Sequence, residues 1–212
     1  MRWLLIVLLA GVASASAGEV IKVCFNYGCL AESEVHYADE QLAQVRSALG
    51  GAANAAEERQ QLSLAIGWLL AWAGRQTPIV ADRGGNTADD GVYGRMDCID
   101  HSTTTSRLLR LLETRGWLRF HRVIEPVSRV RYLFQVHYSA QIEEVVPAGQ
   151  ASGELAEPAR YVVDTWFRDN GRPAVVMTLQ RWLAGDDENG EGKEEAAAAA
   201  AGESVSDSHG ER

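Results

Sequence analysis

Beyond its first residues, the sequence lacks any apolar run long enough to cross a membrane, which takes roughly 20 residues. Glu57 to Gln61 and then Arg75 interrupt the most apolar stretch of the body. The sequence also lacks a basic stripe of the kind that binds nucleic acid, and its net charge is −9. It contains no internal repeat, which excludes repeat architectures. The chain beyond its first residues is long enough for one domain with a sizeable core. We expect neither a nucleic-acid partner nor a membrane-spanning segment in this part of the chain.

The first 17 residues have the pattern of a cleavable signal peptide. Arg2 supplies the positive start, residues 3–12 form an apolar run of about ten residues, and Ala15-Ser16-Ala17 is a small-x-small cleavage site. Cleavage after Ala15 is a second choice, and an uncleaved anchor is the alternative interpretation. No cysteine follows the cleavage point, so no lipid anchor is expected. We therefore expect a periplasmic or secreted protein, if the source is bacterial, with no membrane anchor after cleavage.

From Gly185 onward the composition changes to Gly, Glu, Asp, Ser and a run of six alanines. This segment holds nine acidic and two basic residues, and such a composition cannot bury enough apolar surface to fold. We expect residues 185–212 to form a disordered acidic tail and residues 18–184 to form a single domain.

The chain has three cysteines, and their spacing separates a pair from a single residue. Cys24 and Cys29 have Phe-Asn-Tyr-Gly between them, which in an oxidising compartment favours a disulfide-closed turn. The pair does not have the C-x-x-C spacing of redox motifs, so its expected role is to pin the N-terminal segment. Cys98 is left as the free thiol: a reactive group, an intermolecular bridge or a buried inert side chain.

Apolar periodicity and turn residues predict both helices and strands along the chain. Helices are expected at residues 39–49, 54–74 and 97–115, strands at 20–25, 117–124, 131–145 and 160–167, and a last strand or short helix at 175–183. Residues 77–94 are rich in Gly and Asp and are interpreted as a surface loop and a candidate wall of a cleft. Their acidic spacing does not match an EF-hand, so we expect no calcium site there.

Cys98 stands at the start of the predicted helix 97–115, with Asp97 as its N-cap. Unpaired N–H groups and the helix dipole favour a thiolate at this place, and the same N–H groups can hold a developing oxyanion. Asp97 and Asp100 act against this, because negative neighbours disfavour a thiolate, so a cationic partner is needed. Cys98 and His101 also have the C-x-x-H spacing of half a zinc site. No second half-site accompanies it, and we expect neither a metal nor another cofactor.

His137 is the candidate partner of Cys98. Residues 131–145 alternate between apolar and polar side chains, which places His137 on the polar face of a half-buried strand. His121, on the preceding strand, and His101, one turn along the helix from Cys98, are the competing bases.

Asp164 lies in the middle of the apolar strand 160–167, where an acid is costly unless it has a partner. A connection symmetric about residues 150 and 151 would set it opposite His137. A carboxylate that orients an imidazole, which in turn pairs with the Cys98 thiol, is the Cys-His-Asp arrangement of nucleophilic catalysis.

Four short motifs in this order resemble the bacterial transglutaminase-like cysteine proteinases and, more broadly, the transglutaminase-like superfamily. They cover residues 94–167, about a third of the chain. The motifs are Asp97-Cys98-x-Asp100 opening a helix, Arg115-Gly116-Trp117, a strand with His137, and Tyr161-Val162-Val163-Asp164. Two features differ from the family: the connection from His137 to Asp164 is longer, and His137 lies inside a long strand.

The resemblance implies a papain-like α+β fold in which N-terminal helices and the Cys98 helix pack on an antiparallel sheet. It implies that Cys98, His137 and Asp164 form a catalytic triad acting on an amide or isopeptide bond, in a protein or in a cell-wall peptide. Hydrolysis and transfer to an amine both remain open. The alternative is a non-catalytic binding or scaffold module that retains such a fold.

Overall fold

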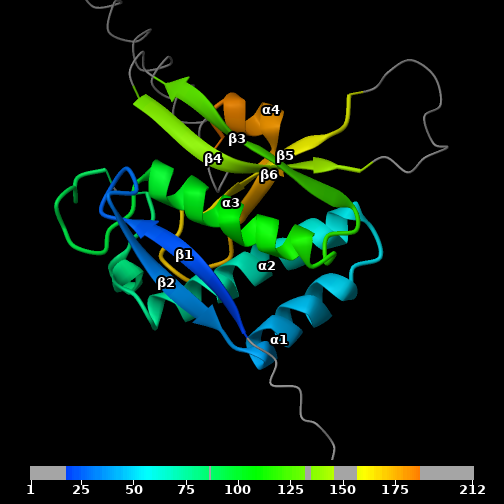
Figure 1. Ribbon diagram of the computed structural model, residues 1–212. Helices are drawn as coiled ribbons and strands as arrows, with labels where there is room; N and C mark the ends of the chain where they lie inside the picture. The colour runs from blue at the N-terminus through cyan, green and yellow to red at the C-terminus, as the bar shows by residue number, and fades with distance from the viewer. Residues whose placement is uncertain (1–17, 86, 132–134, 146–156, 187–212) are drawn as a thin grey trace, which may run out of the picture.

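The computed structural model describes residues 18–85, 87–131, 135–145 and 157–186. The predicted signal peptide and residues 187–212 of the predicted tail lie outside these residues. The described elements form two antiparallel sheets with helices packed around them (Figure 1). This arrangement confirms the predicted α+β class.

The elements follow one another in blocks along the chain. A hairpin comes first, formed by β1 (Glu19–Phe25) and β2 (Ala31–Tyr37). It is followed by α1 (Asp39–Gly50), α2 (Ala55–Gly74), the short 3-10 helix η1 (Pro78–Ala81) and α3 (Cys98–Thr114). The second sheet has the order β3 (His121–Arg131), β4 (Gln135–Glu144), β5 (Arg160–Asp164), β6 (Val175–Thr178), and α4 (Leu179–Leu183) follows it.

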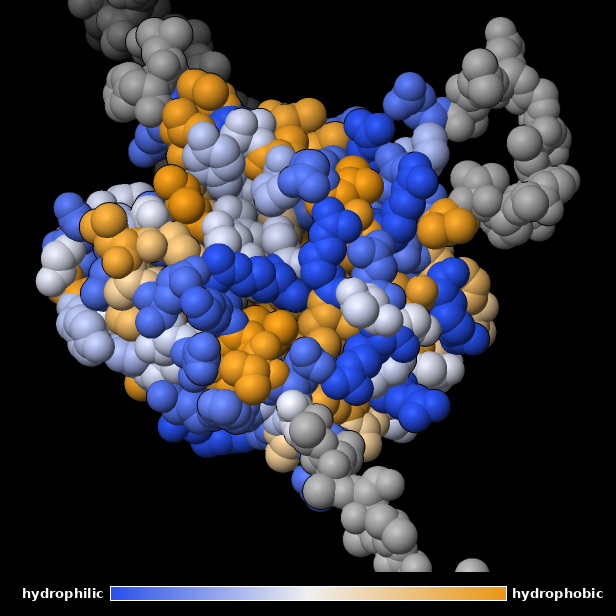
Figure 2. Space-filling view, in the orientation of Figure 1, coloured by the Kyte–Doolittle hydropathy of each residue, from blue (hydrophilic) through white to orange (hydrophobic). Residues whose placement is uncertain are grey.

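Helix α3 lies between the two sheets (Figure 1), in contact with β1 on one side and with β3 and β4 on the other. Its second half contributes Leu108, Leu109 and Leu112 to the core, all with no exposed surface. Its first half carries small residues, and Thr104 Oγ1 accepts the Cys24 N–H at 2.9 Å. The small side chains therefore bring the hairpin close to the start of α3. Hydrophilic residues cover the outward side of α3 (Figure 2).

The helices begin and end close to the predicted positions because their caps are readable in the sequence. Asn54 precedes α2, and its side chain accepts an N–H of the first turn at 2.9 Å. Asp97 precedes α3 and accepts the N–H groups of Ile99 and Asp100. Gly116 follows α3 with φ +67°, the left-handed conformation that glycine tolerates best. None of the described helices is long and apolar enough to span a membrane.

Strand β3 differs from its prediction at both ends. It begins at His121 instead of residue 117 and continues to Arg131, past Glu125 and Pro126. The pairing register with β4 shifts between Ile124 and Val127. A bulge at the edge of a sheet tolerates proline, which has no N–H for the ladder, and β3 is an edge strand.

Strand β5 ends at Asp164, three residues earlier than predicted. The reason is local: Asp164 Oδ1 accepts the N–H of Trp166 at 3.1 Å, an Asx-type turn that competes with the strand. The segment 175–183, left open between strand and helix, contains both, since Thr178 ends β6 and caps α4. Asp186, assigned to the tail from the sequence, is buried and forms an ion pair with Arg181.

Candidate active site

A cavity of about 290 Å³ lies where β4 extends past the end of β5. Strand β5 pairs with residues 140–143 of β4, so among the described residues the start of β4 has a strand partner only in β3. The start of α3 fills the space beside this edge, with the thiol Sγ of Cys98 3.7 Å from the Val136 carbonyl oxygen. The cavity is lined by Cys98 and His137 together with Tyr27, Asp97, Trp166 and Phe167, among others.

Cys98 is the first residue of α3 and is partly exposed. Asp97 Oδ1 accepts the N–H groups of Ile99 and Asp100, at 3.0 and 2.9 Å. The Cys98 N–H has no hydrogen-bond partner among the described residues. One backbone donor therefore remains beside the thiol, at the positive end of the helix dipole.

His137 and Asp164 are in direct contact, with 2.7 Å between Nε2 and Oδ2. The imidazole is 12% exposed and the carboxyl 1%. The two residues are not directly opposite, as a symmetric connection would have placed them. Ala140 pairs with Val163, so Asp164 lies two positions from the place opposite His137, on the same face. A diagonal pair of this kind is still within reach of long side chains.

Two further donors hold the Asp164 carboxylate. The indole Nε1 of Trp182, from α4, donates to Oδ2 at 2.9 Å, and the Trp166 N–H donates to Oδ1 at 3.1 Å. The buried carboxylate therefore has hydrogen-bond partners at both of its oxygens, which offsets the cost of burying it.

The surroundings of His137 favour its protonated form. Its ring lies among the rings of Trp166, Phe167 and Trp182, with centroids 4.9 to 5.6 Å away. Burial lowers the pKa of His137, but the hydrogen bond to Asp164 and the interaction with the Cys98 thiol outweigh it and raise the pKa to about 9. Because Nε2 faces Asp164, Nδ1 is the ring nitrogen left for Cys98. The cation needed beside Cys98 is thus present at neutral pH.

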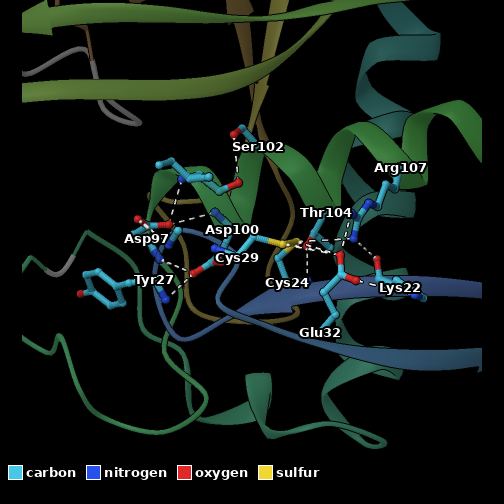
Figure 3. The surroundings of a disulfide bond; sticks show 12 residues. Lys22, Cys24, Tyr27, Cys29, Glu32, Asp97, Asp100, Ser102, Thr104 and Arg107 are labelled. Carbon is cyan, nitrogen blue, oxygen red and sulfur yellow. Dashed lines mark hydrogen bonds and ion pairs between the residues drawn. A yellow bond between two sulfur atoms is a disulfide. The ribbon is translucent and has the colours of Figure 1, made fainter.

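The acidic neighbours of Cys98 accept hydrogen bonds from the turn between β1 and β2 (Figure 3). Asp97 Oδ2 accepts the Gly28 N–H at 3.0 Å, and Asp100 accepts the N–H groups of Tyr27 and Cys29. Burial, reinforced by the charge of Asp97, raises the pKa of Asp100 to about 6 against the opposing effect of its N–H donors.

The two competing histidines belong to other networks. His101 is buried, with Nε2 3.0 Å from Asp82 Oδ2 and Nδ1 2.9 Å from Thr165 Oγ1. His121 places Nδ1 2.8 Å from Glu58 Oε1 and Nε2 3.1 Å from the guanidinium of Arg59. Neither residue lines the cavity of Cys98. Both histidines therefore interact with side chains that lie outside this cavity.

The predicted disulfide between Cys24 and Cys29 is present, and Cys98 is the free thiol, which confirms both assignments (Figure 3). The two disulfide sulfurs and Glu32 form the one cluster of possible metal ligands among the described residues, and the disulfide occupies both sulfurs. His101, the partner in the C-x-x-H half-site, has both ring nitrogens engaged with Asp82 and Thr165.

Several site residues were not found from the sequence. Trp182 lies in a segment that was predicted only as a last strand or short helix, and Tyr27 was predicted only as part of the disulfide-closed turn. Trp166 and Phe167 adjoin the Asp164 motif but received no role. An acid followed closely by aromatic residues is the sequence signal by which Trp166 and Phe167 could have been identified.

Comparison of the chain with protein-family models, with curated proteins and with solved structures finds no match.

Proposed function

We propose that the protein is an exported cysteine-dependent amide or isopeptide hydrolase or acyl transferase. Cys98 is the nucleophile, His137 carries the proton and Asp164 orients His137. The observation that carries the proposal is the contact of His137 Nε2 with the buried Asp164 carboxylate. This contact leaves the other ring nitrogen, Nδ1, for the Cys98 thiol. The order of these residues and the antiparallel sheet beside α3 also fit the transglutaminase-like, papain-like resemblance.

The chemistry proceeds in two halves. In the resting site His137 Nδ1 already carries the proton of the thiol, and the Cys98 thiolate attacks the carbonyl carbon of the amide to form a tetrahedral oxyanion. The Cys98 N–H stabilises that oxygen. His137 then gives its proton to the leaving amine, and the carbon–nitrogen bond breaks to leave a thioester on Cys98. Water or a second amine attacks the thioester carbonyl and His137 takes the proton of the attacking group. The carbon–sulfur bond then breaks, which releases the acyl product and restores the Cys98 thiolate beside protonated His137.

The substrate class follows from the same residues. An amide or isopeptide bond in a protein or in a cell-wall peptide supplies the carbonyl and the leaving amine. Tyr27, Trp166 and Phe167 give the cavity apolar walls that suit a peptide side chain. The disulfide fits an oxidising compartment such as the periplasm or the extracellular space.

Alkylation of the purified, non-reduced protein with iodoacetamide, followed by peptide mapping, tests the nucleophile. We expect Cys98 to be labelled in the folded state near neutral pH. His137→Ala should slow the labelling about tenfold or more, because the thiolate loses its cation. His36→Ala is the matched control, since this exposed histidine lies on β2, outside the cavity.

A Cys98 that reacts only after denaturation would refute the proposal. The alternative, a non-catalytic binding or scaffold module, predicts that Cys98→Ala keeps all biological function. Retained function in a stable Cys98→Ala protein would favour that alternative.

A further inference from the structure

The turn closed by the Cys24–Cys29 disulfide has an unusual backbone. Asn26, Tyr27, Gly28 and Cys29 all have positive φ angles, between 57° and 67°. For a residue with a side chain this left-handed conformation costs on the order of 1 to 2 kcal/mol. A run of such residues persists only where its surroundings hold it in place.

Two carboxylates at the start of α3 hold the turn in this conformation (Figure 3). Asp100 Oδ2 accepts the Tyr27 N–H at 2.8 Å, and Asp100 Oδ1 accepts the Cys29 N–H at 2.6 Å. Asp97 Oδ2 accepts the Gly28 N–H between them at 3.0 Å. Three successive N–H groups of the turn therefore point at two carboxylates that flank Cys98.

Asp100 is the stronger of the two anchors. It has no exposed surface, whereas the Gly28 contact of Asp97 is exposed. Asp100 Oδ2 also accepts the Asp97 N–H at 3.1 Å, which ties the turn to the residue before Cys98. Hydrogen bonds from N–H groups to a buried carboxylate are among the strong ones.

The turn matters for the site because Tyr27 lines the cavity of Cys98. The Tyr27 hydroxyl donates to Asp89, so the side chain joins the turn to the loop before α3. Arg95 binds the same carboxylate of Asp89 at 2.9 Å. The ring position is thus fixed at both ends: at its backbone by Asp100 and at its hydroxyl by Asp89.

We propose that Asp100 is a positioning residue for substrate binding: it holds the disulfide-closed turn against α3 and thereby sets Tyr27 as a wall of the Cys98 cavity. The inference rests on the proposed function and names the device that shapes its site. It acts on the binding of the peptide and leaves the chemistry of the thiol to His137 and Asp164.

The test compares two reagents that react with the same thiol. Iodoacetamide has no peptide portion, whereas a Phe-Ala dipeptidyl chloromethyl ketone must place its side chains in the cavity before Cys98 attacks. Asp100→Ala should weaken inactivation by the peptidyl reagent by roughly ten- to hundredfold. It should not slow iodoacetamide, because the loss of a negative neighbour does not disfavour the Cys98 thiolate. Asp100→Asn, which keeps one acceptor, should fall between wild type and Asp100→Ala. Asp39→Ala, in the first turn of α1, is the matched control.

A double-mutant cycle with Tyr27→Ala identifies the route of the effect. Tyr27→Ala should slow inactivation by the peptidyl reagent and not alkylation by iodoacetamide. Combined with Asp100→Ala, it should cause little further loss. Amide hydrogen exchange gives a reading that needs no reagent: the Tyr27 and Cys29 amides should be protected in wild type and exchange faster in Asp100→Asn. This variant carries the test if Asp100→Ala does not fold.

Equal losses for both reagents, full additivity with Tyr27→Ala, or unchanged exchange at Tyr27 and Cys29 would overturn the inference. A wild-type protein that reacts with neither reagent would overturn the proposed function, and the exchange data would then report on the anchor alone.

Discussion

Asp164→Asn tests the electrostatics of the site with the smallest change of shape. Asp164 Oδ2 lies 2.7 Å from His137 Nε2 and 2.9 Å from Trp182 Nε1, in a carboxyl that is 1% exposed. Asparagine keeps an oxygen for one of these donors. It removes the negative charge that favours a protonated imidazole.

The size of the effect follows from the surroundings of His137. Burial lowers its pKa, and Asp164 leads the opposing contributions that raise it from 6.5 to about 9. An opposite charge at this distance moves a pKa by about 1 to 3, so its loss should bring the pKa of His137 to about 7. That change corresponds to roughly 3 kcal/mol in the preference for the protonated ring.

The sign of the stability effect is fixed by the direction of this shift. The folded-state pKa of His137 is raised, so its contribution to stability is fully present below about pH 6.5 and is lost as the pH rises through about 9. In Asp164→Asn the loss should be nearly complete by about pH 7. Activity that requires protonated His137 should therefore fall at about pH 7 in Asp164→Asn, instead of at about pH 9 as in wild type.

Two measurements check these expectations. An NMR titration of the histidine ring protons, from about pH 5 to about pH 10, gives the pKa of His137 directly. Urea unfolding at the two ends of that range gives the change in stability. Asp39→Asn makes the same chemical change on α1 and should leave the pKa of His137 in place. If His137 titrates near its ordinary value in wild type, or keeps a high pKa in Asp164→Asn, the assignment of Asp164 as its charge partner is wrong.

Two further predictions separate the site from its structural neighbours. Trp182→Phe removes the indole donor to Asp164 and should cost about 1.5 to 3 kcal/mol in unfolding free energy, with a fall in the alkylation rate of Cys98; an unchanged rate in a destabilised protein would assign Trp182 to packing alone. Glu58→Gln breaks the fully buried pair with His121 and should cost about 3 to 5 kcal/mol in unfolding free energy. Because His121 lies outside the cavity, the folded fraction of that variant should alkylate at the wild-type rate, and a slower rate would bring His121 back as a candidate base.

The helices were predictable because their ends are encoded locally. Asn54 and Asp97 accept N–H groups of the turns that follow them, and such capping depends on neighbouring residues alone. The strand ends depend on more distant residues. Glu125 and Pro126 fit within β3 only because this strand is at the edge of the sheet and bulges there, which no local pattern indicates.

For the site, the residue types were readable and their contacts were not. The position of Asp164 in an apolar strand indicated that it needs a partner. The alternation of apolar and polar residues placed His137 on the polar face of its strand. The register between β4 and β5 is not encoded in either strand alone, and a symmetric connection gave a register two residues away from the observed one. Trp182 reaches Asp164 from α4 across 18 positions of sequence, and nothing in its own neighbourhood predicts that contact.

Asp164 connects the shape of the site to its chemistry. Its Oδ1 accepts the Trp166 N–H, which turns the chain and ends β5. Among the described residues, the early end of β5 leaves the start of β4 without a strand partner on that side, and Cys98 lies at this edge. Its Oδ2 meanwhile holds His137. One carboxylate therefore contributes both to opening the space beside β4 and to holding the histidine that faces it. Replacement of Asp164 by alanine, unlike asparagine, should extend the loss from the pKa of His137 to the geometry of the Trp166 turn.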